Sequence, residues 1–389
     1  MVDRVDEEFG FSAVAAVDGA SSHPGPAGDL GHSGFLVTLA GEHFCRGAQQ
    51  PLSEVVTDFG SGTGVNRYGH VPIITIIIVA DAIRRPDRDV ASAADRPFTT
   101  GEGPTGATMH VGVTIFPCQY AIGVTELAVA LEERSFESLW LAEHSHITVN
   151  RQSPWPGGDD LPQMYYDTLD PFACLAAAAA VTDRLKLGTG IALVVQRDPI
   201  HTAKEVATID VLSDGRFLFG IGAGWNLEEM ANHGTDPTRR FGLMRERVEA
   251  MKAIWAAEEA EYHGDQVDFG PIVQNPKPVQ KPHPPIHVGG VYPGALRRAV
   301  RFGDGWMPIA GRGDSDPGGW VRARDEECAR AGRVPASVEI SVYAAPQDPA
   351  RLADLAEAGV DRVMFGLPPE GPETVLPLLD RLAGLFGQL

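Results

Sequence analysis

The sequence predicts an α/β protein, a (β/α)8 barrel of the TIM type, on three observations. From Met109 onward, short runs rich in Val, Ile, Leu and Phe alternate with helical segments. There are eight such pairs, which is the number that closes a barrel. The turn after the first run, "IFPCQYAIG", lacks the glycines that usually follow the first strand of an open doubly wound sheet.

The eight predicted strands are short and apolar, as strands buried on both faces should be. In chain order they are Val111–Phe116, Ser138–Glu143, Leu185–Ala192, Phe217–Gly222, Pro285–Gly289, Gly305–Ile309, Val338–Tyr343 and Arg362–Gly366.

Helix starts are marked between these strands. Asp170 and Asp198 each precede a proline, so each is expected to cap a helix whose first residue is proline. Thr125 is the expected cap of the first barrel helix. A later helix places four apolar residues on one face, which predicts the side that packs on the barrel: Met244, Val248, Met251 and Trp255.

The first 108 residues have a different composition. Segments such as "DGASSHPGPAGDLGHSGF" are rich in Gly, Ser and Pro and carry no lasting helical or strand period. They bury too little apolar surface to offset the entropy of ordering. We therefore expect domain boundaries of 1–108, a disordered extension or sequence upstream of a natural start, and 109–389, the barrel; a small accessory domain is the rival interpretation.

Composition excludes several classes of function. The net charge of −20 argues against nucleic acid and anionic membranes as partners. The four cysteines form no C-x-x-C pair, so neither a metal site nor a disulfide framework is indicated. The N-terminus has no signal-peptide pattern, and the longest apolar run, 71–83, is too short to cross a bilayer. A cytoplasmic protein acting on a small-molecule substrate is expected.

The active site of a barrel is built from the C-terminal ends of its strands. The second strand ends in "AEHSH", which places Glu143, His144 and His146 there. An imidazole at this position can donate to a substrate oxygen or a cofactor ring, and a neighbouring carboxylate can fix its tautomer. We interpret Glu143 and His144 as the catalytic candidates.

Glycines mark three further strand ends. Gly188 and Gly190 indicate either a close backbone approach to a flat ring or plain core packing. "FLFGIGAGW" spaces its glycines as G-x-G-x-G, one residue short of the dinucleotide fingerprint, and we assign the space they leave to a redox cofactor. Gly289 and Gly290 precede a helix and predict a phosphate site.

Three helical features are given structural interpretations. Asn226 and Glu229 read as a capping box, so Glu228 and Glu229 are assigned to a helix start and not to the site. The arginines of "ALRRAVR", namely Arg297, Arg298 and Arg301, are assigned to a solvated helix face. The long loop 147–168, with Trp155, Tyr165 and Tyr166, is expected to cover the barrel mouth.

Together, "SLWLAEHSH", "LGTGIALVVQRDPIHTAKEVATIDVLSDGRFLFGIGAGW" and "PIHVGG…ALRRAVRFGDGWMP" resemble the luciferase-like flavin and deazaflavin oxidoreductases, most closely the branch that uses coenzyme F420. The resemblance implies a homodimeric barrel, a non-proline cis peptide at Gly190–Ile191, and a His144 near the hydride-transfer centre. The cofactor-binding residues it implies are Gly190, Ile191, Ala192, Gly222, Ala223, Gly224, Trp225, Gly289 and Gly290. Some relatives have a proton-transferring Glu where this chain has Trp225, so that role is not transferred.

The resemblance implies an oxidoreductase that transfers a hydride between reduced F420 and a small organic substrate. The alternatives are a two-component monooxygenase that uses reduced FMN, O2 and a separate reductase, and a barrel that binds a cofactor without turnover.

Overall fold

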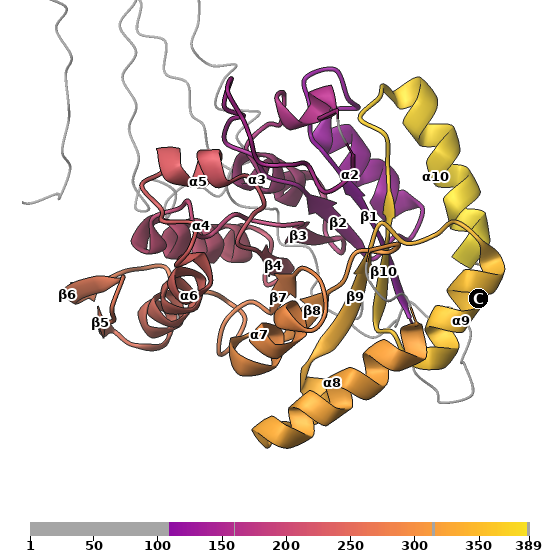
Figure 1. Cartoon of the computed structure of the whole chain (residues 1–389). Coiled ribbons are helices and arrows are strands. Elements are labelled where there is room, and N and C mark those ends of the chain that lie inside the picture. The colour runs from indigo at the N-terminus through magenta and orange to yellow at the C-terminus, as the bar shows by residue number, and fades with distance from the viewer. Residues whose placement is uncertain (1–108, 159, 313–315, 387–389) are drawn as a thin grey trace, which may run out of the picture. The chain divides into compact units, whose positions relative to one another are not determined.

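Residues 109–386, apart from 159 and 313–315, are described by a computed structural model (Figure 1). Eight parallel strands form a closed barrel in the order β1-β10-β9-β8-β7-β4-β3-β2. The predicted (β/α)8 fold is therefore confirmed. The predicted N-terminal extension, 1–108, lies outside the described residues.

All eight predicted barrel strands are present. Most end one to three residues before the predicted limit, because the chain turns away at the barrel mouth. They are β1 (His110–Ile115), β2 (Ser138–Leu141), β3 (Lys186–Thr189), β4 (Phe217–Ile221), β7 (Ile286–Gly289), β8 (Gly305–Met307), β9 (Glu339–Tyr343) and β10 (Arg362–Gly366).

The helices surround the barrel (Figure 1). They are α2 (Val124–Glu133), α3 (Pro171–Val181), α4 (Pro199–Leu212), α5 (Leu227–Asn232), α6 (Arg240–Ala256), α7 (Gly294–Phe302), α8 (Pro317–Ala331), α9 (Pro349–Ala358) and α10 (Pro372–Phe386). The carboxylates of Asp170 and Asp198 accept from the backbone N–H three residues on, each at 2.9 Å, as predicted. The cap predicted at Thr125 is wrong, since Gly123 precedes the first turn and gives it no side-chain bond.

The structure adds a two-stranded antiparallel hairpin between α6 and β7. It consists of β5 (Glu259–His263) and β6 (Asp268–Val273), and most of its residues are partly or fully exposed. Two short 3-10 helices, η1 (Gln163–Tyr165) and η2 (Pro335–Ser337), complete the described elements. Its second strand contains Gly270 and Pro271, which are unusual inside a strand, so the sequence did not predict the hairpin.

The barrel interior is a plug of large side chains. Trp140, Leu218, Met307 and Met364 come from β2, β4, β8 and β10, which are alternate strands of the barrel order. A layer of four residues from alternate strands is the usual filling of such a barrel. Ile191 and Tyr343 pack against this plug, and both belong to the mouth end. The plug therefore closes the barrel and provides the base of the mouth.

No helix in the described ranges is long and apolar enough to cross a membrane.

Candidate active site at the barrel mouth

The chain leaves the barrel sheet for one residue directly after β3. The peptide bond between Gly190 and Ile191 is cis, as the family resemblance implies. The N–H of Gly190 still donates to the carbonyl of Leu141 (2.7 Å), and the N–H of Ala192 donates to Gly220 (2.8 Å). The segment is thus a bulge that is bonded to β2 on one side and to β4 on the other.

Two of the predicted cofactor glycines make room for this bulge. A Cβ at Gly222 would overlap Cδ1 of Ile191, and one at Gly289 would lie 3.0 Å from Cγ2 of the same residue. The space that the sequence assigned to a cofactor at Gly222 is therefore filled by Ile191. Gly224 and Gly290 have a different reason, since φ values of +72° and +129° favour glycine.

His144 is held by a buried carboxylate. Its Nδ1 lies 2.8 Å from Oε2 of Glu229, and the two side chains are 6% and 0% exposed. Burial raises the pKa of Glu229, but the hydrogen bond and charge of His144 and the N–H of Ser145 outweigh it, so the pKa is lowered overall. Glu229 is therefore an ionised acceptor that fixes a proton on Nδ1 and leaves Nε2 to meet a ligand.

This pairing corrects the sequence interpretation of two carboxylates. Asn226 caps α5 as predicted, accepting from the N–H of Glu229 at 3.2 Å, but the Glu229 side chain turns to His144. Glu143 points elsewhere: Oε1 lies 2.7 Å from Nε of Arg197, and Oε2 accepts from the N–H of Leu193. In the structure Glu229, and not Glu143, contacts His144, while Glu143 holds the chain that follows the bulge.

The loop 147–168 is bound to the first turn of α5. Glu228 accepts from the N–H groups of Gln152 and Ser153 at 3.0 and 3.1 Å. The hydroxyl of Ser153 in turn accepts from the N–H of Leu227 at 3.0 Å. Glu228 therefore positions the loop that was expected to cover the mouth.

Five rings meet at the mouth, and we call them the aromatic wall: Phe116, His144, Trp155, Tyr165 and Trp225. Tyr165 lies at their centre, with ring centroids 4.5 Å from Phe116, 5.2 Å from His144, 5.7 Å from Trp155 and 6.2 Å from Trp225. Phe116, Trp155, Tyr165 and Trp225 are partly exposed, whereas the side chain of His144 is 6% exposed. The predicted loop residues Trp155 and Tyr165 belong to this wall, whereas Tyr166 is 49% exposed.

A pair of arginines lies beside the predicted phosphate site. The guanidinium carbons of Arg240 and Arg298 lie 4.6 and 4.1 Å from the ring centroid of Phe241. Both Nε atoms are buried and without a hydrogen-bond partner in the described part of the chain. Burial, and then the charge of Arg240, lowers the pKa of Arg298. Two cations beside one ring, with no ion-pair partner among the described residues, make this pair the candidate anion site.

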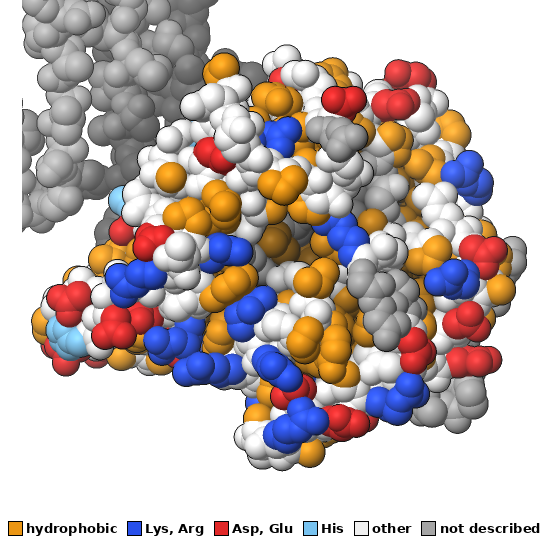
Figure 2. Space-filling model, viewed as in Figure 1, with side chains coloured by type: hydrophobic (Ala, Val, Ile, Leu, Met, Phe, Trp, Pro, Cys, Tyr) orange, Lys and Arg blue, Asp and Glu red, His pale blue; other side chains and the backbone are white. Residues whose placement is uncertain are grey.

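The arginine pair adjoins the glycines through α7. A Cβ at Gly290 would lie 3.3 Å from Cβ of Ala295, and one at Gly294 would lie 3.3 Å from Nη1 of Arg298. Assigning Arg298 to the solvated face was therefore wrong, while Arg297 and Arg301 are exposed as expected. Figure 2 shows Lys and Arg side chains gathered over α6, α7 and α8.

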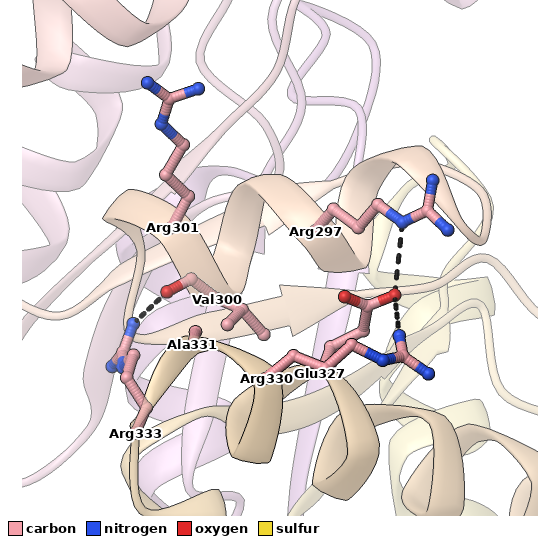
Figure 3. Close-up of a pocket in the computed structure, with 7 residues that line it drawn as sticks. All are labelled: Arg297, Val300, Arg301, Glu327, Arg330, Ala331 and Arg333. Carbon is pink, nitrogen blue, oxygen red and sulfur yellow. Dashed lines mark hydrogen bonds and ion pairs between the residues drawn. The ribbon is translucent and has the colours of Figure 1, made fainter.

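The groove between α7 and α8 also contains arginines, but these have partners, unlike Arg240 and Arg298 (Figure 3). Glu327 lies 3.1 Å from Arg297 and 2.7 Å from Arg330, and Arg333 donates to the carbonyl of Val300 at 2.8 Å. These cations are already paired, and no predicted site residue lines the groove. Within the described residues, no group of three or more His, Cys, Asp or Glu side chains is placed to hold a metal ion.

Comparisons with known proteins show the family of this chain. The family model described as "Luciferase-like monooxygenase" matches residues 104–368. An uncharacterized protein of Mycobacterium tuberculosis is 40% identical over 281 residues, which cover 71% of this chain and 98% of the relative. An F420-dependent glucose-6-phosphate dehydrogenase of Kineococcus radiotolerans is 31% identical over 54% of this chain and 58% of its own.

Two further comparisons concern a relative with another cofactor and a solved structure with the same fold. An FMNH2-dependent dimethylsulfone monooxygenase of Pseudomonas putida is 34% identical over 33% of this chain and 36% of its own. The crystal structure of the monooxygenase RslO1 from Streptomyces bottropensis superposes with a TM-score of 0.59 at 21% identity, covering 71% of this chain and 98% of that one. The chain therefore belongs to the luciferase-like monooxygenase family and is an oxidoreductase of that family, which has F420-dependent and FMN-dependent members.

Proposed function

We propose that this enzyme transfers a hydride between reduced F420 and a small organic substrate. The observation that carries the proposal is His144, whose Nδ1 is bound by the buried Glu229 and whose ring lies in the aromatic wall. Reduction of a carbonyl group requires a hydride at carbon and a proton at oxygen. An imidazole oriented in this way is suited to supply that proton.

The residues of the mouth fit a tricyclic cofactor with a phosphate in its tail. The bulge at Gly190, Ile191 and Ala192 would support the ring, and the segment from Gly222 to Trp225 would border it. Gly289 and Gly290 would receive the phosphate, with Arg298 and Arg240 supplying the charge. When bound, the cofactor supplies the hydride chemistry.

The chain's own residues orient the substrate and manage the proton. His144 donates from Nε2 to the substrate oxygen, and Glu229 stabilises the charged imidazole before the transfer. Glu143 keeps the strand-three bulge in place through Leu193 and Arg197. The aromatic wall excludes water from the reacting face, which strengthens each electrostatic contact there.

A monooxygenase that uses reduced FMN is the second candidate, and it is favoured by the relative from Pseudomonas putida. We rank F420 first because its named relative matches 54% of the chain, against 33% for the FMN-dependent one.

A titration of the purified protein with F420 and with FMN, followed by cofactor fluorescence, tests the choice. We expect F420 to bind more tightly. We also expect Arg298→Met to weaken F420 binding by about ten- to a hundredfold, as loss of a charge-assisted bond predicts. Arg297→Met is the matched control on the same helix and should leave binding unchanged. Tighter binding of FMN would reverse the ranking.

The catalytic assignment is tested by turnover. With reduced F420, His144→Ala should lower kcat by about 10²- to 10⁴-fold, the usual contribution of a general acid. Unchanged turnover and cofactor affinity in this variant would remove His144 from the mechanism.

A further inference from the structure

We infer that the substrate of this site is a flat, conjugated carbonyl compound that stacks on the aromatic wall, and not a sugar phosphate. The inference rests on the proposed function, because it names the substrate class for the same mouth.

The wall is assembled from separate parts of the chain. Phe116 follows β1, His144 follows β2, and Trp225 follows β4, while Trp155 and Tyr165 come from the loop 147–168. Their neighbouring centroids lie between 4.5 and 6.2 Å apart at tilted or edge-on angles. Residues that served only as core would be buried, but Phe116, Trp155, Tyr165 and Trp225 are partly exposed. The wall therefore presents ring surface to a ligand.

Some polar groups at the wall are already bound within the protein. Nδ1 of His144 is bound by Glu229. The nearby carboxylates are also engaged: Glu143 with Arg197, and Glu228 with the loop N–H groups.

The surface of the wall is mostly aromatic carbon, which decides against a polyhydroxylated substrate. Each sugar hydroxyl that enters such a site loses its bonds to water, and a hydroxyl left unpaired costs about 1–3 kcal/mol. A flat apolar ring loses little and gains from contact with aromatic faces. The wall thus selects for a ligand with few polar atoms.

The charges at the mouth identify the one polar group that the ligand needs. The guanidinium carbon of Arg151 lies 5.5 Å from the ring centroid of Trp225, and its Nη1 also donates to the carbonyl of Ser153. His144 contacts the same indole ring at a centroid distance of 5.8 Å. Two potential cations beside one wall favour an oxygen that gains negative charge as hydride arrives at carbon.

The step balances with the proposed cofactor. A hydride is added to the carbonyl carbon, the π electrons move to oxygen, and the proton from Nε2 of His144 completes the hydroxyl group. The carbonyl compound is reduced to an alcohol and the reduced F420 is oxidised. A proton from solvent then restores His144.

Calorimetric titration of the full-length protein, saturated with F420, tests the substrate class. The probes are 2-acetylnaphthalene, a flat conjugated ketone, and glucose 6-phosphate. We expect the ketone to bind more tightly than the sugar phosphate. Tyr165→Ala should weaken ketone binding by about three- to tenfold, since it removes the central ring of the wall.

The chain offers a matched control in the next residue. Tyr166 has the same side chain but is 49% exposed and lies outside the wall, so Tyr166→Ala should leave ketone binding unchanged. Tyr165→Phe keeps the ring and should retain binding, which separates a lost stacking surface from a disturbed fold. Equal weakening in Tyr165→Ala and Tyr166→Ala would overturn the inference.

Turnover separates this inference from the proposed function. If the ketone binds and depends on Tyr165 but oxidises no reduced F420, the wall is supported and hydride transfer is rejected. If glucose 6-phosphate is turned over with reduced F420 while the ketone does not bind, the substrate class is overturned and hydride transfer stands.

Discussion

The two ends of the barrel both contain charged side chains, but they use them differently. At the N-terminal end, Arg362 is 1% exposed and binds Glu137 at 2.9 Å and Glu339 at 2.8 Å. At the mouth, Arg240 and Arg298 have no ion-pair partner among the described residues, and His144 keeps one nitrogen for a ligand. A saturated network holds a fold together, whereas unpaired groups on a rigid frame are available for binding.

The N-terminal end of the barrel, which we call the floor, also shows how burial keeps a histidine uncharged. His287 is fully buried, and burial lowers its pKa to about 4 even though Glu339 lies 3.8 Å away. Its ring therefore stays neutral near neutral pH. His144 has a different contact, because the fully buried carboxylate of Glu229 lies 2.8 Å from its Nδ1.

The largest effect is expected from removing the ion pairs of Arg362 at the floor. Arg362→Met leaves Glu137 buried without its bidentate partner, so we expect the free energy of unfolding to fall by about 3–5 kcal/mol. Denaturant titration measures this loss. Arg301→Met, on an exposed surface, is the control and should change little. A stable Arg362→Met protein would show that the floor network does not determine stability.

Acid should act on the same network. Burial raises the pKa values of Glu137 and Glu339, but Arg362 outweighs it, so both lie below their usual range. A lowered folded pKa contributes stability that is complete above the unfolded value, about 4.3, and is lost as the pH falls through the folded value. Unfolding free energies measured from pH 6 down to pH 3 should therefore decrease. The decrease should be shallower in Arg362→Met, and parallel slopes would contradict this origin.

A smaller effect is expected from the carboxylate that orients the mouth imidazole. Glu229→Gln keeps the shape but removes the charge that fixes Nδ1, so kcat should fall by about tenfold, with the pH profile of kcat displaced. Glu228→Gln is the adjacent control, because its carboxylate binds the loop backbone and not His144. It should change KM more than kcat, and an equal loss of kcat in both variants would count against the orienting role.

The smallest effect is predicted in the groove between α7 and α8. Arg330 is 59% exposed and its ion pair with Glu326 is solvated, while Glu327 keeps Arg297 as a second partner. Arg330→Met should therefore shift the free energy of unfolding by no more than about 0.5 kcal/mol and leave cofactor binding unchanged. A marked loss of cofactor affinity would mean that the groove, and not the arginine pair of α6 and α7, receives the anion.

Local patterns predicted most of the fold. All eight barrel strands were identifiable because buried parallel strands are continuous apolar runs. The two Asp-Pro pairs predicted the starts of two helices. The hairpin β5–β6 was missed because Gly270 and Pro271 interrupt its second strand. The cap at Thr125 was wrong because Gly123 starts the helix without any side-chain bond.

The partners of site residues were harder to predict. His144 was identifiable from its place at a strand end, but Glu229 is 85 positions away and also fits a helix-capping pattern. Arg298 looked like one of three equivalent arginines, and only the packing of α7 on Phe241 distinguished it from Arg297 and Arg301.

The sequence by itself determined which residues stand at the strand ends, because strand periodicity and the barrel rule are local and repeated along the chain. It determined the bulge glycines, His144 and the loop aromatics in this way. The tertiary structure alone decided which carboxylate binds His144, that Ile191 occupies the space beside Gly222, and that five rings form one wall. Those outcomes depend on how segments far apart in the sequence approach one another, and pairing at a distance leaves no local pattern.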